Sequence, residues 1–145
     1  MPKKLGSDYM LWVESAVAGT YNPILGQGNL TISRGAQKID TTSKDDGGYG
    51  TSAFGPRDLS LALDIMPKLP DANGYTRLET LANAASPSPF NVQIRKGGLT
   101  GGTPDVVFQG SVYGNLDDTA FNQGAAVAVK ASFAAAAAPT IDTLA

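Results

Sequence analysis

Hydrophobic and polar residues alternate with a period of two over most of this chain. The clearest run covers residues 57–65, in which leucine or isoleucine fills every second position from Leu59 and aspartate, serine or alanine fills the positions between. This alternation is typical of a strand with one face in the core and the other in water. The same period predicts further strands, at residues 9–13, 30–33, 90–95, 106–113 and 127–133.

Glycine, proline and polar residues mark the connections between the predicted strands. Residues 97–104 contain four glycines and end in proline, which favours a hairpin turn. The polar residues 115–124 are expected to join the last two strands.

One segment between prolines has a helical period instead. Hydrophobic residues recur at spacings of three and four from Tyr75 to Ala85, which predicts a single helix of about three turns packed on the sheet. Its N-terminus has competing caps: Asp71, Asn73, or a capping box formed by Thr76 and Glu79. The pattern as a whole predicts a mainly β domain of roughly six to eight strands with one helix.

The composition excludes several classes of function. The 145 residues are expected to form one domain, at residues 1–133, followed by a flexible alanine-rich C-terminal tail at residues 134–145. The chain has no cysteine and no histidine, which removes thiolate catalysis, cysteine metal sites and a histidine base. The net charge of −2 lacks the basic surplus on which tight nucleic-acid binding depends.

The N-terminus imitates a secretion signal without meeting its requirements. Lys3 and Lys4 precede a hydrophobic run, but this run, at residues 9–13, is short and stands between Asp8 and Glu14. No stretch approaches the roughly 20 apolar residues of a membrane-spanning helix. The sequence therefore predicts an intracellular product without membrane insertion.

No segment carries a complete catalytic or metal-binding motif. The glycines at residues 97–102 lack the lysine of a phosphate-binding loop. Asp45 and Asp46 are adjacent rather than alternate, and no glutamate closes a calcium loop after them. Residues 50–54 depart from the nucleophile elbow of a serine hydrolase at the last position, which is Phe54. We therefore expect no catalytic residue, no metal and no cofactor, and we expect the protein not to be an enzyme.

The centre of the chain resembles a known family. A strand leads into Ile39-Asp-Thr-Thr-Ser-Lys-Asp, a polar, glycine-rich loop follows, and a second apolar strand leaves that loop. This order resembles the major tail tube proteins of long-tailed bacteriophages and gene transfer agents, and the resemblance extends from the first strand to Phe133. It implies an antiparallel β-sandwich or barrel with one flanking α-helix. Such subunits assemble into hexameric rings, which stack into a hollow tube that conducts viral DNA to the host cell.

The resemblance also implies partners and a location. Identical subunits form the hexamer, a tape-measure protein lies in the lumen, and tail terminator and tail-tip proteins bind the ends. DNA is only transiting cargo. The protein is then expected in the virion tail, after assembly in the cytoplasm of the host bacterium. Unprotected sheet edges fit this interpretation, because they invite pairing with another chain, and head-to-tail pairing that closes forms a ring.

Two groups of residues are candidates for this function. The polar loop within residues 39–54 is longer than a hairpin needs, so we expect it to become ordered on an adjacent subunit or ring. Its inter-subunit candidates are Ile39, Asp40, Thr41, Thr42, Ser43, Lys44, Asp45, Asp46, Gly47, Gly48 and Tyr49. The wet faces of two inner strands are expected to line the lumen, with Thr31, Ser33, Asp58, Ser60, Ala62 and Asp64 as candidates. A competing lumen set consists of Asn91, Gln93 and Arg95.

Two alternatives remain open from the sequence. One is a tube subunit of a contractile tail or of a type VI secretion system. The other is a small carbohydrate-binding β-sandwich, although such modules usually present several aromatic residues on one strand face and Trp12 is isolated. We expect Trp12, Tyr21, Tyr49 and Tyr113 in the core or in an interface rather than in base stacking, because no basic surplus accompanies them.

Overall fold

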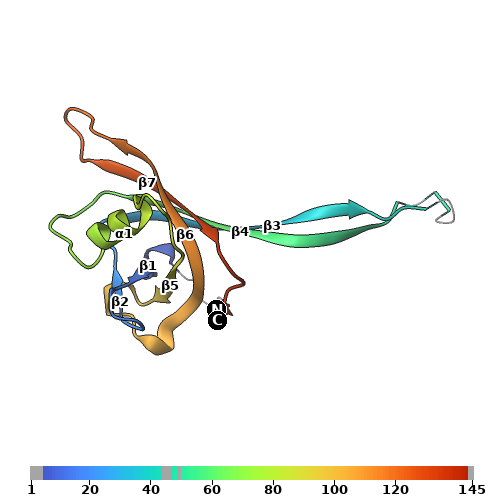
Figure 1. Cartoon of the computed structure of the whole chain (residues 1–145), viewed down its shortest axis with the longest axis horizontal. Coiled ribbons are helices and arrows are strands. Elements are labelled where there is room, and N and C mark those ends of the chain that lie inside the picture. The colour runs from blue at the N-terminus through green and yellow to red at the C-terminus, as the bar shows by residue number, and fades with distance from the viewer. Residues whose placement is uncertain (1–4, 44–46, 49, 144–145) are drawn as a thin grey trace.

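The chain forms an antiparallel sheet of eight strands that curves around a hydrophobic core (Figure 1). The computed structural model describes residues 5–43, 47–48 and 50–143. The strand order is β2-β1-β5-β6-β7-β4-β3, and β8 pairs with β6. The strands are β1 (Tyr9–Glu14), β2 (Tyr21–Pro23), β3 (Gln27–Asp40), β4 (Ser52–Ile65), β5 (Phe90–Lys96), β6 (Val106–Ala120), β7 (Ala128–Ala135) and β8 (Ile141–Asp142).

The sheet folds back on itself because β6 belongs to two layers. Its first half pairs with β5 and its second half pairs with β7. The core lies between the layer of β1, β2 and β5 and the layer of β3, β4 and β7. The predicted strand at residues 57–65 is confirmed: Leu61, Leu63 and Ile65 are buried, whereas Ala62 and Asp64 are exposed. The other fully buried large side chains are Leu11, Val13, Ile24, Leu78, Val92, Phe108, Val112, Val129 and Phe133.

The Gln27 side chain bridges β1 and β3, the strands on either side of the seam in the curved sheet. The Gln27 Oε1 atom accepts a hydrogen bond from the Leu11 N–H at 2.8 Å, and Gln27 Nε2 donates to the Leu11 carbonyl at 2.7 Å. The same nitrogen also donates to the Ile24 carbonyl at 2.8 Å. The amide of Gln27 thus satisfies backbone groups of β1 that a neighbouring strand would otherwise bind.

The helix α1 (Tyr75–Ala82) is shorter than the predicted three turns. The Asp71 Oδ2 atom accepts the N–H of Tyr75 at 3.0 Å and that of Leu25 at 3.1 Å, so Asp71 holds the helix start against the β2–β3 connection. The predicted capping box is wrong, because Thr76 lies inside the helix. Within the described residues, no helix has the length and apolar character needed to cross a membrane.

Three strands extend farther than the hydrophobic pattern predicted. β3 continues to Asp40 and β4 begins at Ser52, so the predicted loop at residues 39–54 shrinks to residues 41–51. β6 continues to Ala120, so the predicted connection at residues 115–124 shrinks to residues 121–127. These strand ends lie outside the core and are wet on both faces. Backbone hydrogen bonds alone define these strand ends. Such bonds do not require alternating hydrophobic residues, so the sequence pattern could not predict them.

The prediction of a flexible C-terminal tail is wrong for the described part of the tail. β7 includes Ala135, and β8 pairs with β6 through Phe108↔Asp142 and Gln109↔Ile141. Between them, the N–H of Thr140 donates to the Gln109 carbonyl at 2.8 Å. The tail therefore follows the edge of β6. The division of the chain at residue 133 stays a prediction.

Candidate assembly surfaces

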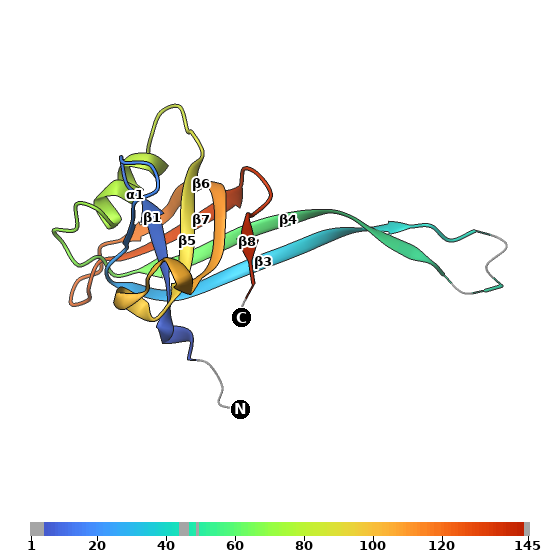
Figure 2. The ribbon, with the colours of Figure 1, turned by 90° about the horizontal axis from the view of Figure 1, so that it is seen from below.

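A two-stranded arm projects from the body of the protein (Figure 2). β3 pairs with β4 out to Asp40↔Ser52, whereas β7 accompanies β4 only from Ser60 to Ile65. We define the arm as residues 35–58. Because a strand advances about 3.3 Å per residue, residues 35–40 carry the ribbon about 20 Å beyond the end of β7.

Threonine hydroxyls continue the arm beyond its last strand pair. The N–H of Thr41 donates to the Thr51 carbonyl at 3.0 Å. The Thr42 hydroxyl donates to the same carbonyl at 3.1 Å and accepts the Thr51 N–H at 2.8 Å. The Thr42 N–H also donates to Asp40 Oδ1 at 2.9 Å. Hydrogen bonds from the Thr42 hydroxyl and amide lower the pKa of the Asp40 carboxyl below its ordinary value.

The predicted inter-subunit residues therefore fall into different parts of the arm. Ile39 and Asp40 belong to β3, and Thr41 and Thr42 are held against Thr51. Ser43, Gly47 and Gly48 are exposed in the turn. Lys44, Asp45, Asp46 and Tyr49 lie outside the described residues. The sequence found the region, but it did not show that its first four residues continue the paired ribbon.

Among its described residues, the arm exposes two large hydrophobic side chains. Phe54 is 74% exposed and lies opposite Lys38, whereas Ile39 is 46% exposed and packs over Gly55. Since Lys38 and Ile39 are consecutive in a strand, the two hydrophobic side chains leave the ribbon on opposite faces. A two-stranded ribbon is at best marginally stable alone in water. We therefore expect the arm to rest on a second surface.

A polar face covers four neighbouring strands of the sheet. Directly paired residues point to the same face, and the pairs Thr31↔Ala62 and Ser33↔Ser60 place the predicted lumen residues of β3 and β4 together. Asp58 and Asp64 share that face by their spacing along β4. The face is opposite the buried leucines of β4. Thr31, Ser33, Asp58, Ala62 and Asp64 are exposed, and Ser60 is half-buried.

Pairing with β7 and β6 adds residues that the sequence did not assign. On β7, Ser132 lies between Ala62 of β4 and Asn115 of β6. Ala134 of β7 lies in the same way between Ser60 and Tyr113. The alternation of hydrophobic and polar residues at 127–133 predicted that Ser132 faces solvent, but it could not show that β7 lies beside β4. Asp64 pairs with Lys130, and Lys130 pairs with Asp118, in the same way. We call the whole set the polar face: Thr31, Ser33, Asp58, Ser60, Ala62, Asp64, Tyr113, Asn115, Asp118, Lys130, Ser132 and Ala134.

The competing lumen set is largely buried in the other layer. Gln93 is 5% exposed and Arg95 is 9% exposed. The Arg95 guanidinium lies 4.3 Å from the centre of the Trp12 ring and donates from Nε to Gln93 Oε1 at 2.9 Å. It also donates to the Gly101 carbonyl at 3.2 Å, and burial lowers the pKa of Arg95. The prediction of a wet strand face is therefore wrong for Gln93 and Arg95, because a turn and an aromatic ring cover them.

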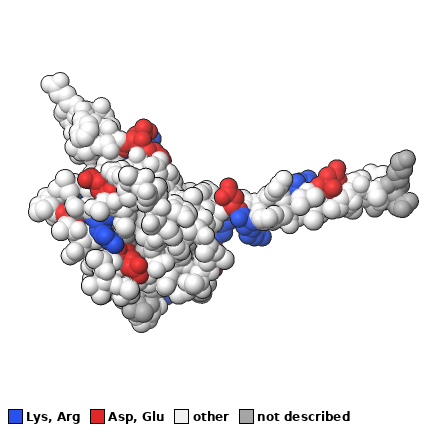
Figure 3. Space-filling model, in the orientation of Figure 1, with Lys and Arg blue, Asp and Glu red and all other residues white. Residues whose placement is uncertain are grey.

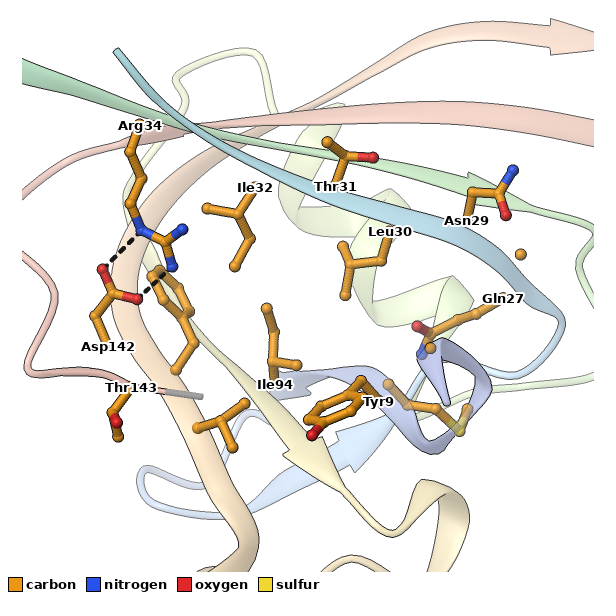
Figure 4. Close-up of a pocket in the computed structure, with 15 residues that line it drawn as sticks. Tyr9, Gln27, Asn29, Leu30, Thr31, Ile32, Arg34, Ile94, Asp142 and Thr143 are labelled. Atoms are coloured by element: carbon orange, nitrogen blue, oxygen red, sulfur yellow. Dashed lines mark hydrogen bonds and ion pairs between the residues drawn. The ribbon is translucent and has the colours of Figure 1, made fainter. Parts of the chain in front are cut away.

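An apolar groove of about 980 Å³ lies at the open seam between β3 and β1 (Figure 4). Leu30 and Ile32 point into it towards Ile94, whereas Thr31 points away from it, as its place in the polar face requires. At one end of the groove, Arg34 Nε donates to Asp142 Oδ2 at 2.9 Å, and a second guanidinium nitrogen donates to Oδ1.

The ion pair of Arg34 and Asp142 joins the base of the arm to the C-terminal strand. The hydrogen bonds from Arg34 lower the pKa of the Asp142 carboxyl, and the same bonds raise the pKa of the Arg34 guanidinium. Both side chains remain partly exposed, so solvent screening limits the pair to about 1 kcal/mol or less. The pair therefore positions β8 more than it stabilises the fold.

Charged side chains are sparse and mixed in sign on the viewed surface (Figure 3). Basic and acidic groups are interspersed along the arm, and acidic groups with a basic group beside them lie where β6 and β7 leave the body. β6 carries Asp117 and Asp118 in that region. The described residues hold no group of three or more histidine, cysteine, aspartate or glutamate side chains placed to bind a metal.

Comparison with known proteins identifies the family. A model of phage tail tube proteins matches residues 3–140. No curated protein matches the sequence. Among solved structures, the fold matches a chain from the tail of an empty gene transfer agent particle refined with C6 symmetry, with a TM-score of 0.75 and 19% identity over 97% of this chain and 100% of that chain.

Two other solved structures show the same fold at lower similarity. The SPP1 tail tube gives a TM-score of 0.67 and 15% identity, over 97% of this chain and 81% of that chain. A sheath–tube complex of an extracellular contractile injection system gives a TM-score of 0.59 and 8% identity, over 95% of this chain and 90% of that chain.

An arm and a continuous polar sheet face define a structural subunit that works through contacts with other chains. The family match then makes the class specific: this chain belongs to the phage tail tube protein family. The resemblance noted in the sequence is confirmed, and so is the mainly antiparallel β fold with one helix.

Proposed function

We propose that this protein forms hexameric rings that stack into a hollow tail tube, through which viral DNA passes to the host cell. The arm carries the proposal, because it projects from the body and exposes Phe54 without a packing partner large enough to bury it. The sixfold symmetry of the gene transfer agent tail with the same fold supports a ring of six.

In this role the partners are mainly copies of the same chain. A tape-measure protein occupies the lumen during assembly, and terminator and tail-tip proteins bind the two ends of the tube. The protein resides in the virion tail after assembly in the bacterial cytoplasm. The first test is negative-stain microscopy of the purified protein, in which rings or tubes support the proposal and a monomer at high concentration contradicts it.

The turn of the arm lies on an adjacent subunit or ring in this proposal. Thr42 and Thr51 already bond to each other across the ribbon, so a two-residue Asn-Gly turn can replace residues 43–50 without opening the hairpin. We expect this variant to remain a folded monomer with an unchanged thermal midpoint, and to form no tubes. Normal tubes from this variant would show that the turn does not contribute to assembly.

The polar face lines the lumen in this proposal. Its side chains are mostly small and uncharged, its acidic residues are Asp58, Asp64 and Asp118, and its one lysine, Lys130, stands between Asp64 and Asp118. Such a surface lets a polyanion slide because it offers few phosphate contacts. Ala62→Lys should fold normally, since Ala62 is exposed, and should slow DNA ejection by adding a ring of positive charge to every layer. Ala62→Gln is the matched neutral control. Equal ejection rates for tubes that carry either variant would place the polar face away from the DNA.

A further inference from the structure

The sheet has a second projection at the end opposite the arm. β7 runs antiparallel to β4, with Ile65↔Val129 at one end of their pairing and Ser60↔Ala134 at the end nearer the arm. The turn between β6 and β7, at residues 121–127, therefore leaves the sheet at the far end. Figures 1 and 2 agree that this turn and the arm point in opposite directions along the molecule.

This second projection carries a hydrophobic side chain as exposed as the one on the arm. Phe121 is 79% exposed, Val127 is also exposed, and the residues between them are uncharged. Asp117 and Asp118 precede Phe121 on β6. A lone exposed phenylalanine is ordinary on a protein surface, but here one stands on each of two projections at opposite ends of one sheet.

Stacked rings need such a pair of surfaces. Stacking head to tail is a heterologous contact, in which a surface at one end of each subunit meets a different surface at the other end of the next. The local charges near the two phenylalanines differ in sign. Lys38 lies directly across the ribbon from Phe54, whereas Asp117 and Asp118 outnumber Lys130, the partner of Asp118 on β7, on the strands that lead to Phe121.

We propose that the β6–β7 turn is the docking site for the arm of another copy of this chain, in the adjacent ring. Phe54 and Phe121 share one hydrophobic contact, and Lys38 faces the acidic residues of β6. This inference rests on the proposed stacking of rings and adds the partner surface of the arm.

The other exposed hydrophobic residues at the same end fit the arm less well. Met66 and Leu69 lie in the connection after β4 and are exposed. Leu69 follows Lys68, which would place a second positive charge beside Lys38. The strands that lead to the β6–β7 turn carry two aspartates, Asp117 and Asp118, against one lysine, Lys130. We therefore assign the arm to this turn rather than to residues 66–69.

Cysteine cross-linking tests this contact, because the chain contains no cysteine of its own. Ser52→Cys lies on the same face of the arm as Phe54, and Asn122→Cys lies beside Phe121; both positions are exposed and both phenylalanines are kept. Oxidation of tubes that carry both substitutions should give a ladder of covalent multimers on a non-reducing gel. The unassembled monomer should give no internal cross-link, because the two positions lie at opposite ends of the molecule.

The matched control combines Ser52→Cys with Lys68→Cys, which tests the alternative acceptor at the same end. A ladder from this pair and none from the Asn122→Cys pair would overturn the assignment, as would tubes in which neither pair cross-links. Both of these outcomes leave the proposed function intact. If the unmodified protein forms neither rings nor tubes, the proposed function and the docking site fail together.

A double-mutant cycle gives an independent readout. Phe121→Ala should raise the critical concentration for tube formation at least tenfold, and combining it with Phe54→Ala should raise it little further, because both changes remove the same contact. If the double variant instead raises the critical concentration by the product of the two single effects, the two side chains contact different surfaces, and the proposal is overturned.

Discussion

Replacing Phe54 by alanine should weaken tube assembly without weakening the fold. Phe54 is 74% exposed on the arm, so its removal takes little packing from the monomer. We expect the thermal midpoint of the monomer to stay within the range of ordinary surface substitutions, about 0.5 kcal/mol in unfolding free energy.

The expected loss of assembly follows from the exposed area. A buried aromatic residue covers about 150–250 Å², and 74% of a mid-range value leaves about 150 Å² available for contact. At about 25 cal/mol per Å² this area contributes nearly 4 kcal/mol. Fixing the side chain costs about 1 kcal/mol, which leaves about 2.7 kcal/mol per subunit. That difference corresponds to about a 100-fold change in the association constant.

Sedimentation of tubes at increasing protein concentration measures this effect as a shift in critical concentration. Gln37→Ala is the matched control, because Gln37 is also exposed on the arm but contributes no large hydrophobic surface. A critical concentration unchanged by Phe54→Ala would refute the inference that the arm buries Phe54 on assembly. A large fall in the thermal midpoint would refute its assignment as a side chain free of the core.

Two further predictions concern the fold and the C-terminal strand. Leu61→Ala should lower the unfolding free energy by about 2–5 kcal/mol, because Leu61 is buried in the core. Ala62→Ser at the neighbouring exposed position should change the unfolding free energy little. Equal effects of the two substitutions in thermal unfolding would contradict the assignment of the two faces of β4. Arg34 lowers the pKa of Asp142. The ion pair therefore stabilises the attachment of β8 fully at any pH above the ordinary aspartate pKa, and this stabilisation is lost as the pH falls through the lowered pKa of Asp142. The protection of the β8 amides against hydrogen exchange, measured relative to the intrinsic exchange rate at each pH, should fall in acid. Asp142→Asn should show the lower protection already at neutral pH, and an Asp142→Asn variant with unchanged protection would contradict a role for the ion pair.

The sequence alone determined the kind of fold and the family. A period of two is a local property: it records which side of a strand faces water, and the buried side of residues 57–65 followed from it directly. The wet side of the same strand supplied the predicted lumen residues of β4. The order of the central strands and their polar loop carried the resemblance to tail tube proteins, which the family match confirms.

Only the tertiary structure decided which strands lie side by side and which polar residues stay in water. Nothing local places Ser132 of β7 beside Ala62 of β4, because that pairing joins segments 70 residues apart. Arg95 alternates like a solvent-exposed residue, yet Trp12 of β1 and the glycine turn after β5 cover it. The arm and the attached tail are held mainly by backbone hydrogen bonds, which leave no hydrophobic pattern in the sequence, and threonine hydroxyls and the ion pair of Arg34 and Asp142 add to them. Hydrophobic burial leaves a period in the sequence, but contacts between distant segments exist only after the chain has folded.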